Sequence, residues 1–323
     1  MGSQGGTVTR LLKVDLGVIG RLCLCMFWVG ASGSESGRGS IRFILGMHRM
    51  SRPIAVRPVR EWPVLTAARF RDEIVAGGQP AVLRGLAEHW PVVVAARQDP
   101  RRAIAMLLAH AAAVPVEVLR ADPEEQGRFH YRADGRSLNF VRGAADFRAF
   151  LTALDEHATR QRPYAIAVQG LIADRHLPGF ARAHPMPSVP RSAEPRLWIG
   201  NAAKVAAHND PVDNLAIVAL GRRRFTLFPP DAEANLHMGP AHPTPAGVPV
   251  SMVDVTAPDL ERFPLYAKAL EQAQEAELAP GDAIFIPRDW FHHVEALDRL
   301  NMLVNYWWDA GAAGAEERSE TDA

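Results

Sequence analysis

The stretch NLAIVALGRRRFTLFP, residues 214–229, holds two short apolar runs on either side of a glycine turn. Aliphatic residues fill the first run, aromatic residues enter the second, and Gly221 and Pro229 mark their ends. Runs of this length with such borders are typical of β-strands. Similar short runs flank this stretch, and they are RLWIG, KVAAHN, DAIFIP, HHVEAL and NMLVNYWW. Many short strands joined by such turns predict a β-sandwich or barrel.

The chain before this region predicts helices mixed with strands. A helix follows the N-cap residue Thr66 and ends at Gly77, and a second follows Asp99 with a proline at its first position. A third helix is expected within 143–159, and strands are expected over 80–84, 114–121 and 164–170. Downstream, one helix of about 259–275 interrupts the strands. The segment 130–140 is expected either to line the barrel mouth or to form an ordinary hairpin.

Composition places the chain among ordinary globular proteins. It has 323 residues, 48% hydrophobic and 22% charged, with 36 basic and 36 acidic side chains. This balance does not favour nucleic acid or membrane partners. The two cysteines, Cys23 and Cys25, both precede residue 30, so the rest of the chain excludes a disulfide framework, a cysteine metal site and a thiol nucleophile. A reducing, cytoplasmic location fits this usage.

The organisation expected is one domain over 51–310 with a barrel core at about 160–308. The first 50 residues differ in character, with a short apolar run before a Gly/Ser stretch. They are expected to be an over-called upstream extension starting before Met47 or Met50; a signal or anchor segment and a disordered tail are the alternatives. Residues 311–323 are expected to be a disordered acidic tail.

The segment AAHNDPVDN, residues 206–214, contains a candidate ligand pair. Residues i and i+2 of a strand point to the same face, so His208 and Asp210 would project together. An imidazole and a carboxylate on one face suit a divalent first-row metal. Alone the pair is a weak signal, because a solvated loop pair looks the same.

A second segment, PGDAIFIPRDWFHHVEAL, offers a third ligand. It carries His292 and His293 at the start of another predicted strand. Either histidine could complete a set of two histidines and one carboxylate, which leaves metal positions open for a cosubstrate and O₂. Less favoured is a metal site at His237 and His242, which flank a loop. Trp290, Trp307 and Trp308 are expected in core or mouth packing rather than as a substrate platform.

The region from Arg196 to Trp308 resembles the JmjC or cupin-like domain of the 2-oxoglutarate oxygenase superfamily. The stretches LWIG, AHND, NLAIVALGRRRFTLFPPD, VDVTAPDLERFP, PGDAIFIPRDWFHHVEAL and VNYWW occur in the family's order and spacing. REWP and QPAVLRGLAEHWP extend the similarity over most of 58–308. Asparaginyl hydroxylases and bacterial cupin-like proteins belong to this group. The resemblance implies a mainly β fold with added helices, a double-stranded β-helix or jelly roll behind an N-terminal helical and mixed segment.

Carried over position by position, the resemblance makes His208, Asp210 and His292 the metal ligands, with His293 turned away. Four residues would meet the cosubstrate, namely Arg223, Asn214, Asn305 and Tyr164. The family's cosubstrate-binding lysine is replaced by Arg223, for which a surface strand position is the alternative.

Two positions depart from the family pattern. Val205 stands where the family often has a threonine, and Ile166 stands where it has a tyrosine, with Tyr164 two residues earlier. Both changes remove expected hydrogen bonds to 2-oxoglutarate. They bear on use of the cosubstrate more than on metal binding.

The function implied is an Fe(II)- and 2-oxoglutarate-dependent hydroxylase of a protein or small-molecule substrate. The alternative is a metal-binding cupin-like module that does not use 2-oxoglutarate and serves a binding or regulatory role. A histone demethylase is less favoured, because the sequence contains no reader domain or basic tail. A homodimer through 259–277 and the C-terminal aromatic residues stays an open alternative.

Overall fold

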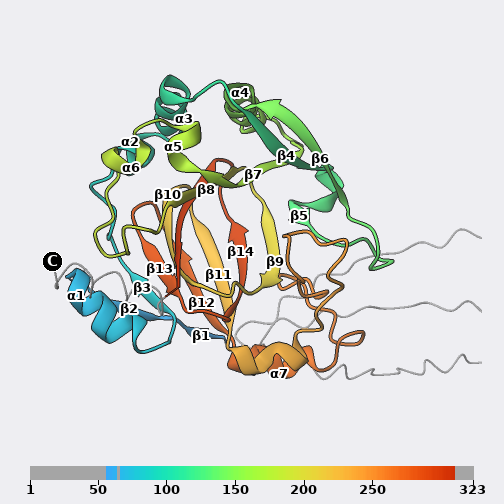
Figure 1. Cartoon of the computed structure of the whole chain (residues 1–323). Coiled ribbons are helices and arrows are strands. Elements are labelled where there is room, and N and C mark those ends of the chain that lie inside the picture. The colour runs from blue at the N-terminus through green and yellow to red at the C-terminus, as the bar shows by residue number, and fades with distance from the viewer. Residues whose placement is uncertain (1–55, 64–65, 310–323) are drawn as a thin grey trace, which may run out of the picture. The chain divides into compact units, whose positions relative to one another are not determined.

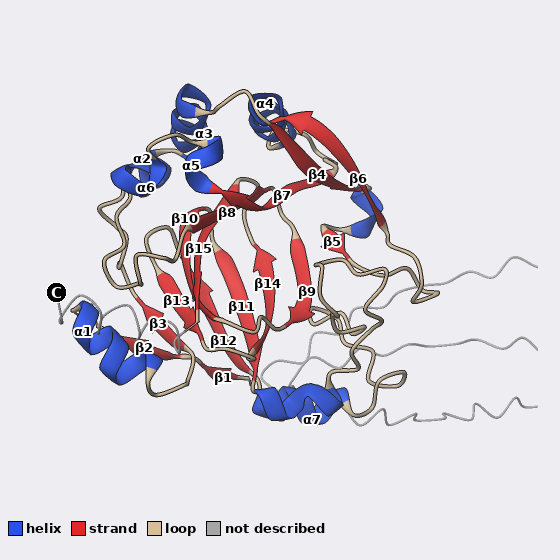
Figure 2. Cartoon of the chain, in the orientation of Figure 1, coloured by secondary structure: helices blue, strands red, loops and turns tan. Residues whose placement is uncertain are grey.

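Two β-sheets face each other in the computed structural model, which describes residues 56–63 and 66–309. The smaller sheet has the strand order β1-β12-β11-β14-β9-β5, and the larger has β2-β3-β13-β10-β15-β8-β7-β4-β6 (Figures 1 and 2). The strands from β8 to β15 pass back and forth between the sheets as in a jelly roll, with only β11 and β12 following each other in one sheet, and this order confirms the expected fold. Within the described ranges the sheets remain separate and form no closed barrel.

The strands are β1 (Arg57–Pro58), β2 (Arg60–Trp62), β3 (Ala81–Leu83), β4 (Pro115–Ala121), β5 (Arg128–Phe129), β6 (Phe140–Asp146), β7 (Ala165–Ile172), β8 (Pro195–Gly200), β9 (Lys204–His208), β10 (Asp213–Leu220), β11 (Arg223–Phe228), β12 (Gln274–Leu278), β13 (Ala283–Ile286), β14 (Phe291–Ala296) and β15 (Asn301–Trp308). The α-helices are α1 (Ala67–Arg69), α2 (Pro91–Gln98), α3 (Pro100–His110), α4 (Phe147–His157), α5 (Ala173–His176), α6 (Phe180–Ala183) and α7 (Tyr266–Gln272). A π-helical turn (Phe70–Val75) and two 3₁₀ turns (Pro123–Glu125 and Pro230–Asn235) complete the elements.

In strand β10, alternate side chains pack into two different hydrophobic cores, one on each face of the larger sheet. All eight of its residues are buried. Leu215, Ile217 and Ala219 pack in a core with the N-terminal helices, whereas Ala216 and Val218 pack between the two sheets. A strand covered on both faces reads as a continuous apolar run. The helices α2 to α6 accordingly lie outside the larger sheet, and α7 lies on the other side of the molecule, against the smaller sheet (Figure 2).

Most predicted elements are present, with local corrections. Thr66 caps a helical start that passes into the π-helical turn, and Asp99 caps α3 through its bond from the Arg101 amide. The third predicted helix begins only at Phe147, because Gly143–Asp146 belong to β6. Within 130–140, Asp134 accepts bonds from two following amides, and the segment forms a hairpin-like turn away from the pocket.

The helix expected over 259–275 is wrong at both ends. Helix α7 begins only at Tyr266, after Pro264, whose missing N–H disfavours an earlier helix. Residues 274–278 form β12 instead, with Ala276 and Leu278 facing the inter-sheet core while Glu275 and Glu277 pair with arginines outside. The polar positions that suggested a solvated helix therefore belong partly to a two-residue strand repeat.

The extension expected at 1–50 and the tail expected at 311–323 lie outside the described residues. Within the described part, no helix combines the length and apolar character needed to cross a membrane.

The packing between α6 and α2 depends on a buried neutral histidine. His184 Nδ1 donates to the Phe180 carbonyl (2.9 Å), and the Val92 amide donates to His184 Nε2 (3.3 Å). Because Nε2 accepts, this imidazole is uncharged in the fold. Burial lowers the pKa of His184 below that of an exposed histidine.

We expect the free energy of unfolding to fall as the pH drops below about 6.5, because the unfolded chain then binds protons that the fold excludes. One such group contributes a slope of at most about 1.4 kcal/mol per pH unit. Denaturant titrations from pH 7 to pH 5 measure it. His184→Gln, which can keep both hydrogen bonds, should reduce the slope, and His89→Gln at an exposed position should not. An unchanged slope in His184→Gln would contradict this assignment.

Candidate metal centre and adjoining pocket

Three potential ligand side chains meet between the two sheets. His208 ends β9, Asp210 follows in the next loop, and His292 lies near the start of β14. Their ligand atoms all lie within 4.8 Å of one another, and no other described residues form such a group of three. The two histidines face each other across the antiparallel β9–β14 pair, with ring centroids 4.4 Å apart. Residues 84 positions apart in sequence are thus joined by strand pairing.

Backbone carbonyls orient both imidazoles. His208 Nδ1 lies 2.8 Å from the Ala206 carbonyl, and His292 Nδ1 lies 3.1 Å from the Trp290 carbonyl. A carbonyl only accepts, so each Nδ1 carries a proton, and in a neutral imidazole Nε2 then presents the lone pair that a metal needs. A hydrogen bond on the far ring nitrogen is the usual way in which proteins orient metal-binding histidines.

The separation of His292 and Asp210, and the charges of the two groups, fit a shared divalent ion. Two donors bound to one ion at about 2.1 Å can lie at most about 4.2 Å apart. His292 Nε2 and Asp210 Oδ2 are 3.7 Å apart, which fits this limit and is too long for a hydrogen bond. Burial, followed by the neighbouring His208, lowers the pKa of His292 to about 4, with Asp210 opposing. The residues present therefore supply a neutral donor beside a carboxylate.

A β-bulge in β9 brings a further residue into the same space. Val294 pairs with Val205 and His292 pairs with His208. Between these two pairs β9 advances by three positions and β14 by two, so β9 contains one extra residue. The extra residue restores the inward direction at both ends, and Val205 and His208 line one pocket although they are three positions apart. Val205 offers that pocket no hydrogen bond.

His293 lies on the opposite face of β14 from the pocket. It pairs with Thr226 and lies two residues after Phe291, which packs on the α7 side of the smaller sheet. Burial lowers the pKa of His293 to about 4. Of the two histidines in the sequence pair, His292 is the one beside His208 and Asp210.

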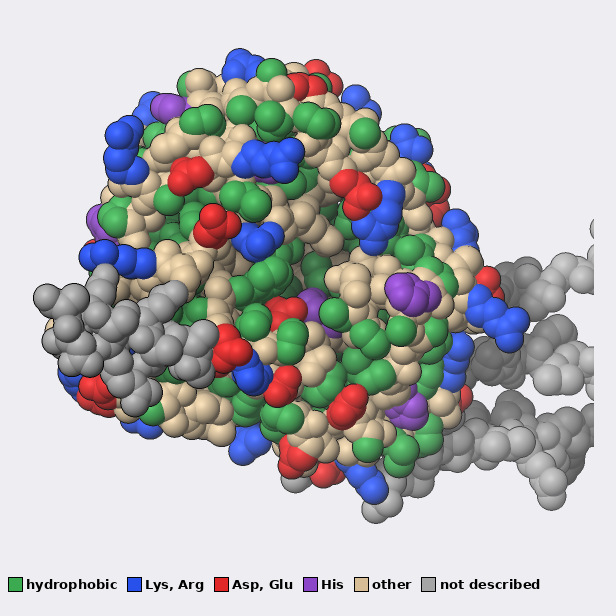
Figure 3. Space-filling view, in the orientation of Figure 1, with side chains coloured by type: hydrophobic (Ala, Val, Ile, Leu, Met, Phe, Trp, Pro, Cys, Tyr) green, Lys and Arg blue, Asp and Glu red, His purple; other side chains and the backbone are tan. Residues whose placement is uncertain are grey.

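The pocket has a volume of about 310 Å³ and opens on the hollowed face of the molecule (Figure 3). Apolar side chains fill much of the hollow, and both acidic and basic side chains lie around it (Figure 3). Asn214 and Asn305 lie in its wall, and Asn305 Nδ2 donates to Asn214 Oδ1 at 2.8 Å. Trp307 also lines the pocket, edge-on to Trp198 at 5.2 Å.

Arg223 places a buried positive charge in this pocket. Its neighbours Arg222 and Arg224 point outward and pair with acids, whereas Arg223 is only 7% exposed. Arg223 Nη2 donates weakly to the Trp198 carbonyl (3.4 Å), and Nε has no hydrogen-bond partner. Burial lowers the pKa of Arg223 to about 10, so the side chain stays charged at neutral pH. Within the described residues no acid pairs with it, and a surface position is excluded.

Tyr164 lies outside the pocket. Its ring packs beside His157, with Arg120 over its face at 5.1 Å, and it is 37% exposed. Ile166 points into the core shared with the N-terminal helices. The residues of β7 that reach the pocket are Gln169 and Gly170, at a bulge where Gly170 has φ of +65°. The expectation that Tyr164 contacts the cosubstrate therefore does not fit the position of this strand.

Sequence reasoning missed the mouth of the pocket. Glu117 on β4 and Arg142 on β6 line it together with the loop around Pro245. Arg142 Nη1 lies 2.6 Å from Glu117 Oε1, and its Nη2 donates to the Pro245 carbonyl at 3.3 Å. The only available sequence signal was the polar alternation of these two strands, which does not reveal what they face.

The other singled-out residues have structural surroundings. Trp290 packs in the core between the sheets and Trp308 in the core under the helices. His237 packs against the ring of Phe263 at 5.0 Å. Neither His237 nor His242 belongs to the one group of candidate ligands found in the described part of the chain.

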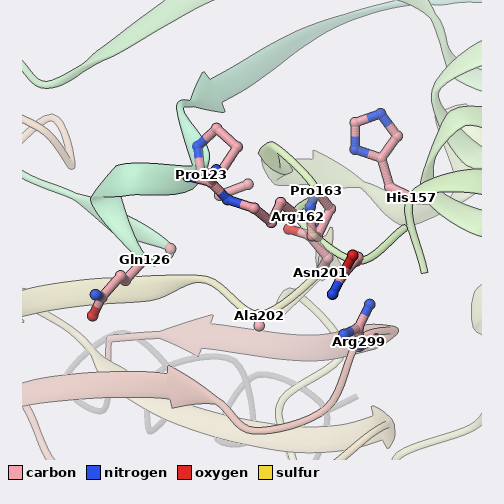
Figure 4. A pocket seen from close by; sticks show the side chains of 11 residues that line it. Pro123, Gln126, His157, Arg162, Pro163, Asn201, Ala202 and Arg299 are labelled. Carbon is pink, nitrogen blue, oxygen red and sulfur yellow. The ribbon is translucent and has the colours of Figure 1, made fainter. Parts of the chain in front are cut away.

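A second pocket of about 330 Å³ lies away from the triad, and Figure 4 shows His157, Arg162 and Arg299 around it. Arg162 pairs with Glu124, and Arg299 donates to backbone carbonyls after α4. Its basic side chains thus already have partners, and it contains no group of metal ligands.

The sequence is similar to those of several known proteins. It is 28% identical over 278 residues to the Lysine-specific demethylase JMJ31 of Arabidopsis thaliana, which covers 76% of this chain and 49% of that protein. It is 27% identical over 304 residues to the human Bifunctional peptidase and (3S)-lysyl hydroxylase JMJD7, covering 85% and 91%. It is 38% identical over 122 residues to human HSPB1-associated protein 1, covering 35% and 23%. The chain spans about half the length of the Arabidopsis relative.

The profile of the Cupin-like domain matches residues 67–313, which include every described strand except β1 and β2 and all three candidate ligands. This match covers well over half of the sequence and agrees with the jelly-roll order of the strands. The chain therefore belongs to the cupin-like, JmjC-type family.

Proposed function

We propose that this protein is an Fe(II)- and 2-oxoglutarate-dependent oxygenase that hydroxylates a protein or small-molecule substrate. One observation carries the proposal: two histidines and a carboxylate share a pocket with a buried arginine that has no acidic partner among the described residues. JmjC-type relatives generally use this ion and this cosubstrate, which supports the same reading.

His208, Asp210 and His292 would hold the metal through Nε2 of each imidazole and a carboxylate oxygen. Two histidines and one carboxylate are the usual ligand set of non-heme iron oxygenases. The bound ion would supply the open positions and redox chemistry that activate O₂. The chain's own part is to hold the ligands in place through the Ala206 and Trp290 carbonyls and to exclude water from a largely apolar pocket.

Arg223 would bind the far carboxylate of 2-oxoglutarate. A guanidinium presents two parallel N–H groups to a carboxylate and forms charge-assisted bonds about twice as strong as neutral ones. Its second donor can replace the hydrogen bond that Val205 cannot make. An uncompensated buried charge is costly, and an anionic ligand would remove that cost.

The substrate would enter past Glu117 and Arg142. Two relatives carry lysine-directed names, so a lysyl side chain in a protein is the first substrate class to test. Glu117 lies at the mouth with its side chain 60% exposed and could meet an ammonium group. We expect lysine-containing peptides to gain the mass of one oxygen atom, and Glu117→Gln to raise KM more than it lowers kcat. Oxidation at another residue type would contradict the lysyl assignment.

Removing a ligand should abolish metal binding. His208→Ala and Asp210→Ala each delete a donor, and we expect Fe(II) or Mn(II) affinity to fall by more than about 100-fold, beyond the loss usual for residues that only support a ligand. Anaerobic titration calorimetry measures the affinity. His237→Ala is the matched control, since it removes a partly buried histidine outside the triad. Wild-type affinity in His208→Ala would contradict the proposed centre.

Removing the buried charge of Arg223 should weaken the binding of 2-oxoglutarate without weakening the binding of metal. Arg223→Met keeps much of the side-chain length, and we expect 2-oxoglutarate affinity to fall about 30-fold, the equivalent of about 2 kcal/mol for lost charge-assisted bonds. Metal affinity should stay unchanged, and the ligand-free variant should be at least as stable as wild type because a buried charge is gone.

Arg222→Met is the control for this measurement, because its outward side chain pairs with Asp298 and Glu277. Titration calorimetry of both variants and the wild type gives the comparison. If the wild-type protein binds metal but neither binds nor consumes 2-oxoglutarate, the second candidate, a metal-binding cupin-like module, is favoured. Val205 and the distance of Tyr164 from the pocket are the observations that support that candidate.

A further inference from the structure

Two hydrogen bonds join the chain around Asp210 to the turn that precedes His292. Asp210 lies in the loop between β9 and β10, and the turn 287–290 lies between β13 and β14. The Asp289 amide donates to the Asp210 carbonyl at 2.9 Å, and the Arg288 amide donates to Asp213 Oδ1 at 3.0 Å. The backbone of one ligand is therefore held by the turn that precedes another.

The turn also orients the imidazole of His292. The Trp290 amide closes the turn on the Pro287 carbonyl (3.2 Å), and the Trp290 carbonyl accepts from His292 Nδ1. A shift of this turn would move that carbonyl and the support of Asp210 at the same time. The distance of 3.7 Å between Asp210 Oδ2 and His292 Nε2 thus depends on where the turn lies.

The turn contains a conformation that needs external support. Asp289 has φ of +65°, in the left-handed region that disfavours residues other than glycine. Such a residue persists when the surroundings fix it. The bond from Asp289 to the β9–β10 loop and the bond from Arg288 to Asp213, at the start of β10, supply that support.

Asp213 is buried at 8% exposure although it is a carboxylate. The Arg288 guanidinium turns outward to Asp309 (2.9 Å), so the bond that Asp213 accepts comes from the Arg288 main chain. Burying a carboxylate costs free energy unless hydrogen bonds compensate. This carboxylate lies three residues after Asp210, and the bond from the Arg288 amide links it to the turn.

We propose that Asp213 is a positioning residue of the metal centre, whose carboxylate holds the turn 287–290 and thereby sets the separation of Asp210 and His292. The inference rests on the proposed metal centre. It assigns Asp213 no contact with metal or substrate. It explains how two ligands from distant strands keep one geometry.

The test compares Asp213→Ala with Asp213→Asn in the full chain. Asparagine keeps an acceptor oxygen at the same reach, whereas alanine removes it. We expect Asp213→Ala to weaken Mn(II) or Co(II) binding by about 10- to 100-fold, as for residues that orient ligands, and Asp213→Asn to restore most of the affinity. The visible absorption of the Co(II) protein should change in Asp213→Ala, since ligand geometry changes. Hydrogen exchange at the Arg288 amide should accelerate only in Asp213→Ala.

Asp309→Ala is the matched control. It removes the carboxylate paired with the Arg288 side chain and leaves the Asp213 bond, so metal affinity should stay at the wild-type value. If Asp213→Ala does not fold, Asp213→Ser, whose hydroxyl is too short to reach the Arg288 amide, replaces it in the same titration.

The outcomes separate the two proposals. A wild-type protein that binds neither Mn(II) nor Co(II) overturns the metal centre itself. Wild-type metal affinity in Asp213→Ala, with only a lowered melting temperature of the metal-free protein, shows a structural role and overturns the positioning role. Equal losses in Asp213→Asn and Asp213→Ala overturn the hydrogen bond as the cause.

Discussion

The register of β9 against β14 is the constraint on which the candidate centre depends. It sets His208 opposite His292. Because side chains alternate across a strand, a slip of one residue would turn His292 outward and His293 inward. Packing on both faces of the smaller sheet resists this slip, since Phe291 is buried on the α7 side and Val294 between the sheets. The apolar pattern that forms the fold is thus also what keeps the ligands together.

The same pocket holds polar groups that the fold alone leaves poorly satisfied. Arg223 Nε, Asn305 Oδ1 and Trp307 Nε1 are buried without hydrogen-bond partners, and all three residues line the pocket. Buried polar atoms are normally paired, so these three can still accept or donate hydrogen bonds to a ligand in the pocket. A ligand that pairs with them would stabilise the folded chain by mass action. The proposed function therefore agrees with the buried, unpaired charge of Arg223.

Much of the fold and of the metal centre could be predicted from the sequence, because both follow from the two-residue alternation of side chains along strands. The two-residue period predicted that His208 and Asp210 project together, and the family resemblance selected His292 over His293. The middle arginine of the RRR run does lie in the pocket. Structure was needed where the period changes or distant strands meet. No residue near Val205 indicates the bulge that brings it beside His208. Strand β12 could not be recognised from the sequence, because its glutamates resemble the solvated face of a helix.

Tertiary pairing accounts for the remaining differences. Glu117 and Arg142 reach the pocket because β4 and β6 extend the larger sheet beyond β7, a neighbourhood that no local pattern encodes. Tyr164 misses the pocket because β7 enters it only at its later bulge. Asp213 resembled an ordinary turn residue until its partner, the Arg288 amide 75 positions later, was known.

The outer strands have a consequence for the order in which the chain is assembled. Near the start of the described residues, β1 pairs with β12 and β3 pairs with β13. Neither pairing can form before a segment about 200 residues downstream has been made. Pairings between such distant segments form slowly, because a long loop must close before any contact stabilises it. During synthesis β1 therefore lacks β12, and the local β2–β3 pair lacks β13, until most of the protein has left the ribosome. The ligand set is completed later still, because His292 follows both partner strands.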